Sequence, residues 1–433
     1  MGLTSSNSRR GLRIAIAEAS AAAVHSVLVG GALLTGFALA WSATDFQLGL
    51  LGAMPFLGAM FQVAGAYAVD RWPDRRRLTV AGAGLIARGS WFLIAALPFL
   101  CNGSASLCMA WILILYLFYQ FALNASGPGW VAWLAVLVPS RVRGRFLGRR
   151  YLLMEGFNIT TLLIAGFTID AFRASGYERH GFALLHFCAG VAGLLCFLFL
   201  MRQPDPGHCV ARPELHLRYV LQPLRNARFR RLVVFNLYWF VGLTICSPFL
   251  NAHLIKNLHW SFKELALLGM LASMASLAMY PVWGRQADRH GFKPVMMICA
   301  AGMIHLPLYY VFCPWNMRWP IYLCNLLLGL FVSGFNLALF GLTLDGLPKE
   351  GRAMGSAVLA GLSGPAVFLS GAASGWVAEA LADVHWQISG LDLSNYQLLF
   401  AASMVLRLPA FALIARIPEQ GAHDVRALFG LGR

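Results

Sequence analysis

Long apolar stretches recur along most of this 433-residue chain, and they constrain its fold more than any other feature. A helix of about 20 apolar residues crosses the hydrocarbon core of a bilayer. Most connections between the stretches are short, so the sequence predicts an all-α membrane protein with twelve transmembrane helices. We place the spans at approximately 13–41, 47–69, 78–100, 106–135, 149–172, 182–201, 232–254, 262–284, 294–313, 319–344, 353–381 and 396–416.

The composition excludes the common classes of soluble protein. Hydrophobic residues make up 59% of the chain and charged residues 12%, against about 25% charged residues in an ordinary soluble domain. Soluble enzymes, disordered chains and secreted disulfide scaffolds are therefore excluded. The nine cysteines form no C-x-x-C motif, so we interpret them as small apolar packing residues. The first span is too long for a signal peptide and is kept as a membrane helix.

The basic residues predict how the chain is oriented. With the N-terminus in the cytoplasm, the cytoplasmic segments hold 27 Lys and Arg residues and the opposite side holds 5. This asymmetry follows the positive-inside rule, so we expect both termini in the cytoplasm and a multi-pass protein of the cytoplasmic (inner) membrane. The net charge of +16 is then a topology signal, with membrane lipid as the partner and no nucleic acid.

The longest connection divides the chain near its midpoint. We expect an N-terminal six-helix bundle at 1–201, a cytoplasmic linker at 202–231 and a C-terminal six-helix bundle at 232–433. Two motifs recur in both halves. An acidic loop contains Asp70 in one half and Asp288 in the other, and Gly-Arg-x-x-Gly occurs at 144–148 and 351–355. Repeated halves build many transporters, whose substrate site lies between the halves near the bilayer midplane.

Residues 284–293 carry the more specific copy of the loop motif. They read G-x-x-x-D-R-x-G-x-K, which resembles the loop signature of the major facilitator superfamily. The first-half copy departs from it, with Ala66 and Pro73 at the two glycine positions. The resemblance implies that family's fold, without a resident cofactor. It also implies alternating access, in which two bundles rock about a central cavity lined mainly by helices 1, 4, 7 and 10.

The resemblance further implies a conformational latch at the cytoplasmic ends of the helices. A carboxylate where one helix ends and another begins can face a positive helix N-terminus and nearby arginines. The alternative is that these loop charges only set the topology. The predicted latch residues are Asp70 with its candidate partners Arg143 and Arg145, Asp288 with its candidate partner Arg352, and Arg71, Gly284, Arg289, Gly291 and Lys293.

Polar side chains at membrane depth are unfavourable unless they face a cavity or a partner. Glu18 and His25 share one face of the first span and are candidates for proton coupling. Neutral amides and aromatic rings suit an uncharged polar solute such as a sugar. For each residue the alternative is an ordinary interhelical hydrogen bond. The predicted substrate-cavity residues are His25, Gln120, Asn124, Asn236, Trp239 and Asn336.

Some charges and prolines fall inside the predicted spans. Arg88 and Arg407 lie at span centres, where a bare Arg is unfavourable by about 2.5–3.5 kcal/mol on insertion scales. Each should therefore find an acid, a carbonyl or water. Glu155, three residues before Asn158, is a candidate for such a network. Four prolines also lie inside the spans, where we expect either bends or breaks or, equally, structural tolerance. They are Pro128, Pro248, Pro281 and Pro365.

Absent motifs narrow the function. The chain has no G-x-x-x-x-G-K motif, no H-E-x-x-H motif and no recognisable catalytic arrangement, so we expect neither an enzyme nor a cofactor or metal site. We predict a secondary active transporter of a small polar organic solute, with a sugar-like compound as the candidate solute and H+ or Na+ as the candidate coupling ion. The alternatives are an exporter of hydrophobic or amphiphilic compounds and a non-transporting sensor or partner on the same fold.

Overall fold

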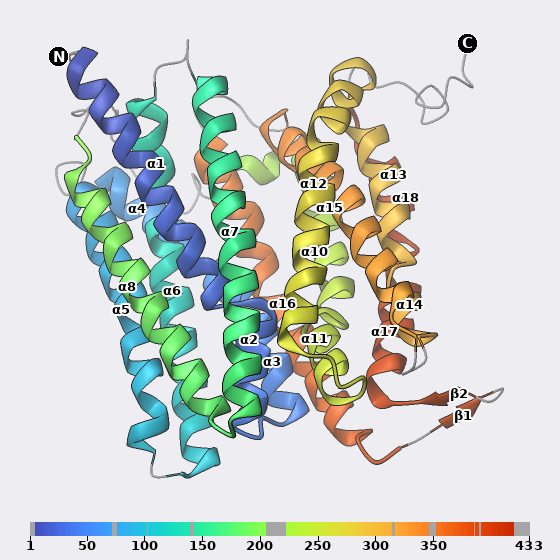
Figure 1. Ribbon diagram of the computed structural model, residues 1–433. Helices are drawn as coiled ribbons and strands as arrows, with labels where there is room; N and C mark the ends of the chain where they lie inside the picture. The colour runs from blue at the N-terminus through green and yellow to red at the C-terminus, as the bar shows by residue number, and fades with distance from the viewer. Residues whose placement is uncertain are drawn as a thin grey trace. The chain divides into compact units, whose positions relative to one another are not determined.

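A computed structural model describes residues 5–71, 76–101, 103–138, 143–204, 222–313, 317–345, 352–384, 386–388 and 391–419. Within these ranges the chain is helical apart from turns and one hairpin (Figure 1). In the hairpin β1 (Trp386–Ile388) pairs antiparallel with β2 (Leu391–Leu393). The helices are α1 (Ser5–Leu28), α2 (Gly31–Ala40), α3 (Asp45–Gly58), α4 (Phe61–Arg71), α5 (Arg76–Leu100), α6 (Ala105–Leu137), α7 (Arg143–Ala174), α8 (Glu178–Arg202), η3 (Gln222–Arg225), α10 (Ala227–Thr244), α11 (Ser247–Lys256), α12 (Phe262–His290), α13 (Phe292–Ile304), α14 (Pro307–Val311), α15 (Trp319–Asp345), α16 (Arg352–Ala380), α17 (Asn395–Arg407) and α18 (Ala410–Ala415).

The predicted fold class is confirmed. Among the described residues, 11 helical segments are long and apolar enough to cross a membrane, and Gly84–Leu100 is a shorter apolar helix. Each of the twelve predicted spans coincides with one helix or with two consecutive helices. The positions and lengths of the apolar stretches were therefore sufficient to locate every described span.

Five predicted spans are divided into two helices within the described residues. The first is divided at Gly30 and Gly31, and the φ angle of Gly31 is +55°, which favours glycine. Pro248 follows the break between α10 and α11. The expected breaks at Pro128 and Pro281 are wrong, because α6 and α12 continue through them, as α16 does through Pro365. A proline removes one backbone N–H, and membrane helices tolerate the loss where neighbouring groups compensate.

The chain forms two compact units. Unit 1 comprises Met1–Ala43, Met54–His216 and Ser261–Ala266, and unit 2 comprises Thr44–Ala53, Leu217–Trp260 and Leu267–Arg433. Two helices, α3 and α12, therefore each begin in one unit and continue in the other. Of the predicted linker at 202–231, residues 205–221 lie outside the described residues.

In unit 1, α5 packs against α6 and α8, and α1 packs against α7 and α8. Close approaches between helices depend on glycine. A Cβ atom at Gly65 of α4 would lie 1.9 Å from the carbonyl oxygen of Ala125 in α6. A Cβ atom at Gly193 of α8 would lie 2.5 Å from the Cβ atom of Arg88 in α5. These contacts hold the helices of unit 1 close around their polar interior.

In unit 2, α10 packs against α16 and α17, α13 packs against α15, and α14 packs against α17. Aromatic rings fill the space beside α10. Trp239 is fully buried, and its ring stacks on Phe335 of α15 with centroids 4.8 Å apart. The core of unit 2 is therefore closed by large apolar side chains.

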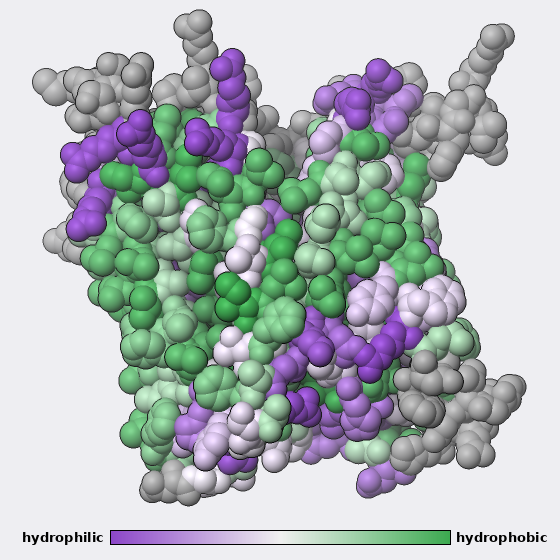
Figure 2. All heavy atoms as spheres, viewed as in Figure 1, coloured by the Kyte–Doolittle hydropathy of each residue, from purple (hydrophilic) through white to green (hydrophobic). Residues whose placement is uncertain are grey.

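The outward faces of the helices are also apolar, as expected for contact with lipid. Figure 2 shows hydrophobic side chains over most of the visible face of unit 1, with hydrophilic side chains gathered toward its ends. Leu93, Phe99, Phe118 and Phe167 are each at least half exposed. In water such a surface would aggregate, whereas lipid tails cover it at no cost.

Candidate functional site

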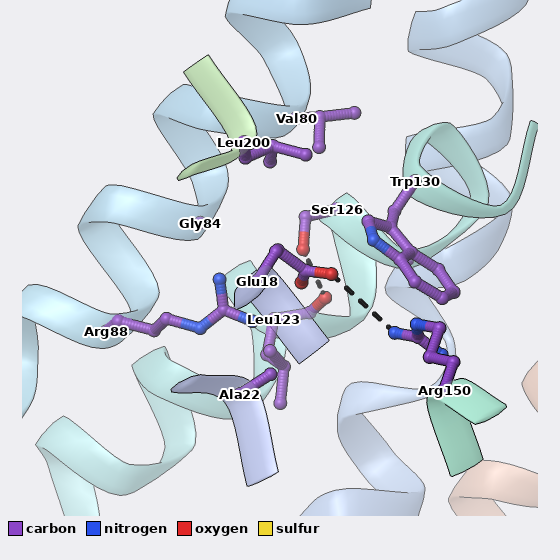
Figure 3. A pocket seen from close by; sticks show the side chains of 11 residues that line it. Glu18, Ala22, Val80, Gly84, Arg88, Leu123, Ser126, Trp130, Arg150 and Leu200 are labelled. Carbon is purple, nitrogen blue, oxygen red and sulfur yellow. Dashed lines mark hydrogen bonds and ion pairs between the residues drawn. The ribbon is translucent and has the colours of Figure 1, made fainter. Parts of the chain in front are cut away.

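A cavity of about 270 Å³ lies inside unit 1 and contains three ionisable side chains (Figure 3). They come from three different helices: Glu18 from α1, Arg88 from α5 and Arg150 from α7. The rest of the lining is small or apolar apart from one hydroxyl group, and consists of Ala22, Val80, Gly84, Leu123, Ser126, Gly127, Trp130 and Leu200.

Glu18 and Arg150 form a buried ion pair. Arg150 Nη2 lies 3.6 Å from Glu18 Oε2, and the two side chains are only 5% and 4% exposed. The Cys196 thiol donates to the other carboxylate oxygen at 3.2 Å, and the guanidinium of Arg150 lies 4.8 Å from the centre of the Trp130 ring. The count of cytoplasmic cations includes Arg150, and the structure shows that its side chain is buried within unit 1.

Arg88 approaches Glu18 from the side opposite Arg150 (Figure 3). Among the described residues no carboxylate lies within 4.0 Å of the Arg88 guanidinium, and its Nε has no hydrogen-bond partner there. With Glu18 ionised, the cavity therefore holds two positive charges and one negative charge. Of the expected partners for Arg88, an acid, a carbonyl or water, the described structure shows an acid nearby in the cavity, Glu18, without a direct ion pair.

His25 is buried but does not line this cavity. Its Nδ1 lies 2.8 Å from the carbonyl oxygen of Ala189, and its Nε2 lies 3.2 Å from the hydroxyl of Tyr119. A carbonyl only accepts, so Nδ1 carries the proton and Nε2 accepts from the tyrosine. His25 thus connects α1 to α8 and α6, which corresponds to the alternative interpretation of a packed, hydrogen-bonded histidine.

The predicted amides of α6 also bond to protein groups. Asn124 Nδ2 donates to the carbonyl oxygen of Gln120 at 2.9 Å, and Gln62 Nε2 donates to Asn124 Oδ1 at 2.9 Å. Gln120 is 6% exposed. These residues lie together where α6 meets α4, and they do not line the charged cavity.

The predicted cavity residues of unit 2 do not converge on one point. Asn236 donates to Ser363 Oγ at 3.0 Å and connects α10 to α16. Trp239 belongs to the aromatic core, whereas Asn336 is exposed on α15. The structure therefore gives these three residues different surroundings.

The two remaining buried-charge candidates have local partners. Arg407 is 1% exposed, donates from Nε to the carbonyl oxygen of Ser403 at 3.2 Å, and lies 5.5 Å from the centre of the Trp239 ring. Its expected carbonyl partner is thus present. Glu155 accepts from Asn158 Nδ2 at 3.2 Å, so this pair forms its own contact within α7.

The second-half copy of the predicted latch forms the turn between α12 and α13. Gly291 has a φ angle of +92°, and Asp288 and Arg289 are exposed in the last turn of α12. The N-terminus of α13 is capped instead by Glu419, whose carboxylate oxygens accept from the backbone N–H groups of Phe292 at 2.9 Å and Lys293 at 2.7 Å.

The other predicted latch residues give less information. The Lys293 ammonium donates to the carbonyl oxygen of Ala415 at 2.7 Å. Gly284 lies within α12, and Arg145 is exposed on α7. The side chains of Asp70, Arg71, Arg143 and Arg352 lie outside the described part of the structure.

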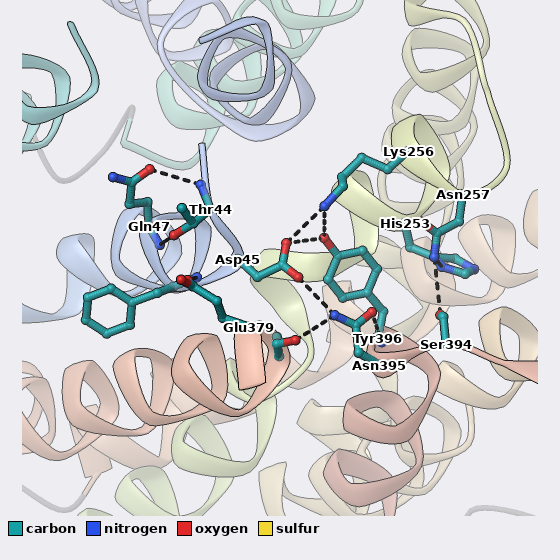
Figure 4. Close-up of polar contacts among 12 residues, drawn as sticks. Thr44, Asp45, Gln47, His253, Lys256, Asn257, Glu379, Ser394, Asn395 and Tyr396 are labelled. Atoms are coloured by element: carbon teal, nitrogen blue, oxygen red, sulfur yellow. Dashed lines mark hydrogen bonds and ion pairs between the residues drawn. The ribbon is translucent and has the colours of Figure 1, made fainter. Parts of the chain in front are cut away.

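Unit 2 contains a polar network around the start of α3 that the sequence did not indicate (Figure 4). One oxygen of Asp45 accepts from the Lys256 ammonium at 3.1 Å and the Tyr396 hydroxyl at 2.5 Å. The other oxygen accepts from Asn395 Nδ2 at 2.9 Å. Asp45 therefore joins α3 to α11 and α17, and its side chain is only 6% exposed.

Carboxylates cap both helices that change units. In unit 1, Asp170 of α7 accepts from the backbone N–H groups of Phe262 and Lys263 at 2.9 and 2.8 Å, at the start of α12. In unit 2, Glu379 of α16 accepts from the backbone N–H of Phe46 at 3.0 Å, at the start of α3. The two acids and the two helix starts are each separated by about half the chain, so the internal repeat extends to these contacts.

Comparisons with known proteins place the fold. The description of the matching family model is Major Facilitator Superfamily, and the match covers residues 232–428. No curated protein matches the chain significantly by sequence.

Solved transporter structures match the fold over nearly the whole chain. A point mutant of the nucleoside transporter NupG gives a TM-score of 0.71 at 13% identity, covering 94% of this chain and 100% of that one. A D-xylose-proton symporter gives 0.68 at 14% identity, covering 95% and 98%. A bacterial homologue of the iron transporter ferroportin in an inward-facing state gives 0.67 at 12% identity, covering 95% and 98%.

These named neighbours are transporters, not enzymes. The apolar helices make this chain a multi-pass membrane protein, and the half that the family model matches includes the loop motif at 284–293. The Major Facilitator Superfamily model matches the second half of the chain, and these solved transporters share the fold of nearly the whole chain.

Proposed function

We propose that the protein is a secondary active transporter that moves a small polar organic solute across the cytoplasmic membrane by alternating access. The observation that carries this proposal is the convergence of Glu18, Arg88 and Arg150 on one cavity among membrane-spanning helices. Ionisable groups at membrane depth are unfavourable, and where they face a cavity they typically mark a substrate or ion pathway.

The nature of the neighbours supports a polar solute. Two of them are named as a nucleoside transporter and a D-xylose-proton symporter, and both of those solutes are small and carry several hydroxyl groups. The sequence has no phosphate-binding loop of the G-x-x-x-x-G-K type. An ion gradient is therefore the proposed source of energy.

Glu18 is the proposed site of proton coupling. Its carboxylate lies in the cavity beside Arg150, whereas both ring nitrogens of His25 already bond to Ala189 and Tyr119. Protonation of Glu18 would remove its charge and release Arg150 from the ion pair. The occupancy of the cavity would then depend on the proton gradient.

The capped starts of α3 and α12 support alternating access. Each of these helices begins against a carboxylate from the other half of the sequence, Glu379 for α3 and Asp170 for α12. Charge-assisted hydrogen bonds of this kind hold one arrangement and are exchanged for water in another. We propose that they break and re-form during the transport cycle.

Uptake by proteoliposomes tests the proposal. The full chain is reconstituted and offered sugars, nucleosides, organic acids and amino acids, with and without an inward proton gradient. We expect one solute class to accumulate, and accumulation to need the gradient. Glu18→Gln should lose gradient-driven accumulation but keep solute exchange, while Glu178→Gln, at a partly exposed acid paired with Arg173, should behave as wild type.

Other outcomes distinguish the rivals. Extrusion of amphiphilic dyes without uptake of any polar solute would replace the proposal by the exporter. No movement of any compound in correctly folded protein would favour a non-transporting sensor or assembly partner.

A further inference from the structure

We infer that the cavity between Arg88 and Arg150 selects solutes that carry a single carboxylate, and that a proton on Glu18 opens the cavity to them. This inference rests on the proposed function and narrows it from polar solutes in general to small organic monocarboxylates. It is carried by the charges, the unmet hydrogen-bond donors and the size of the cavity.

The cavity holds one more positive charge than negative charge when Glu18 is ionised. Arg88 and Arg150 are permanently protonated, because guanidinium does not lose its proton in proteins. Glu18 is the one carboxylate that lines the described cavity, so one positive charge has no counter-charge within it. An unbalanced charge among membrane helices is unfavourable. A solute carboxylate would supply the missing negative charge, whereas a neutral sugar would not.

The arrangement of the two arginines also favours a bound carboxylate. Arg88 and Arg150 lie on opposite sides of the Glu18 carboxylate (Figure 3). In the described structure the Nε groups of both arginines are buried donors without a hydrogen-bond partner. The Trp130 ring beside Arg150 holds that guanidinium in place. Planar guanidinium groups bind carboxylates through paired N–H donors, so these donors match a carboxylate bound beside Glu18.

The volume of the cavity limits the size of the solute. The cavity volume is about 270 Å³, near the lower end of ordinary small-molecule sites. Gly84 and Gly127 leave room on α5 and α6, and Leu123 gives an apolar wall. A compact organic acid fits these features. A phosphate dianion does not fit them, because it has no apolar part to contact Leu123 and carries two negative charges, whereas the cavity needs only one.

A proton on Glu18 would permit a solute carboxylate to bind beside it. An ionised Glu18 repels a solute carboxylate bound beside it. When Glu18 takes a proton from solution, the repulsion ends, and both arginines can serve the solute. One proton and one monoanion then load together and leave together. The total charge of the site is the same in its empty, ionised form and in its loaded, protonated form, so loading is electroneutral.

Ligand-dependent thermal unfolding of the purified full chain tests the inference. The probes are lactate and benzoate, their neutral amides lactamide and benzamide, and inorganic phosphate. A ligand that binds only the folded state raises Tm, and at a fixed ligand concentration the rise grows with the logarithm of its affinity. We expect the two acids to raise Tm, more at about pH 5.5 than at about pH 7.5, and the amides and phosphate to have no effect.

Variants assign the effect to the cavity. Arg88→Gln and Arg150→Gln should abolish the acid response. Arg149→Gln is the matched control, because Arg149 precedes Arg150 on α7 but is exposed. Glu18→Gln should bind the acids independently of pH. If the glutamine variants fold poorly, Arg88→Lys keeps the charge without the planar fork and should weaken acid binding about tenfold.

Several results would overturn the inference. Equal rises in Tm with the acids and the amides would contradict selection by charge. A preference for phosphate would contradict selection of monocarboxylates. An Arg149→Gln variant that loses the response would place the effect outside the cavity. Uptake of a neutral solute by protein that binds neither acid overturns this inference alone. Acid binding without uptake of any compound supports the site and overturns the transport proposal.

Discussion

The ammonium nitrogen of Lys256 lies 3.1 Å from a carboxylate oxygen of Asp45, across a sequence distance of about half the chain. Tyr396 donates to the same oxygen, and Asn395 donates to the other. Because α3 begins at Asp45, this network fixes the start of α3 in unit 2. The start of a helix otherwise has unpaired backbone groups and frays easily.

Replacing Asp45 should therefore destabilise unit 2. We expect Asp45→Asn to lower the free energy of unfolding by about 1.5–3 kcal/mol, the range for hydrogen bonds to charged groups. Lys256→Met should cost less, because the lysine side chain is 43% exposed and Asp45 keeps two other donors. Thermal and chemical unfolding in detergent measure both variants. Asp383→Asn, at an exposed acid of the same unit, is the control; equal losses in all three variants would contradict the network.

Asp170 and Glu379 should act as independent helix caps. Removal of a cap typically lowers stability by about 0.5–2 kcal/mol, and we expect this range for Asp170→Ala and for Glu379→Ala. The two acids belong to different units and share no partner among the described contacts, so the losses should add in the double variant. Unfolding of the single and double variants tests this. A double variant no less stable than either single one would show that the caps act on one common event.

Gly127 lines the charged cavity, and a Cβ atom there would meet nothing within 4 Å. Gly127→Ala should therefore fold normally, with a gain of up to about 1 kcal/mol from helix propensity. The added methyl group should narrow the cavity and weaken the binding of bulky solutes more than that of small ones. Solute panels in binding and uptake assays measure this. Gly82→Ala adds a methyl group to α5 with no neighbour within 4 Å and should leave the solute profile unchanged.

Replacing Arg407 tests whether this buried cation of unit 2 has a structural role or a role in transport. Its guanidinium contacts Trp239 and the Ser403 carbonyl, and no described carboxylate pairs with it. A buried charge without a charged partner is unfavourable because the side chain loses its hydration, so an apolar side chain of similar volume avoids this cost. Arg407→Met should accordingly unfold at the same or a higher temperature than wild type. Selective loss of uptake in this folded variant would instead assign Arg407 a role in transport.

Reversing the charge of Asp288 tests the predicted cytoplasmic latch. Its side chain is exposed, so Asp288→Lys should insert and fold like wild type. If the latch operates in another conformation, charge reversal should still lower the uptake rate. Expression, Tm and proteoliposome uptake measured on one preparation separate the two effects. Unchanged uptake would leave Asp288 with a topological role only, and Asp383→Lys controls for the charge change itself.

Hydropathy located the membrane helices well because each span needs about 20 apolar residues in a row. It could not locate the divisions within spans. The break at Gly30 and Gly31 depends on one positive φ angle, and Pro128 and Pro281 lie in unbroken helices. Local residue preferences favour both outcomes at such positions, and packing against neighbouring helices decides between them.

The charged cavity was partly predictable. Glu18 and Arg88 were singled out because charges are conspicuous within apolar runs. Arg150 was missed because it lies beside Arg149 at the edge of a span, and the sequence does not indicate which of two adjacent arginines points inward. Asp170 and Glu379 were missed for a related reason: acids near helix ends are common, and only the folded chain shows which helix start each one meets.

The exchange of short segments between units has a consequence for how the protein is made. Neither half of the sequence supplies every residue of one unit, since Thr44–Ala53 completes the unit built mostly from the later half and Ser261–Ala266 completes the other. During synthesis, the earlier half must therefore wait for the later one before its own packing is finished. Assembly of either unit therefore requires residues from both halves of the sequence.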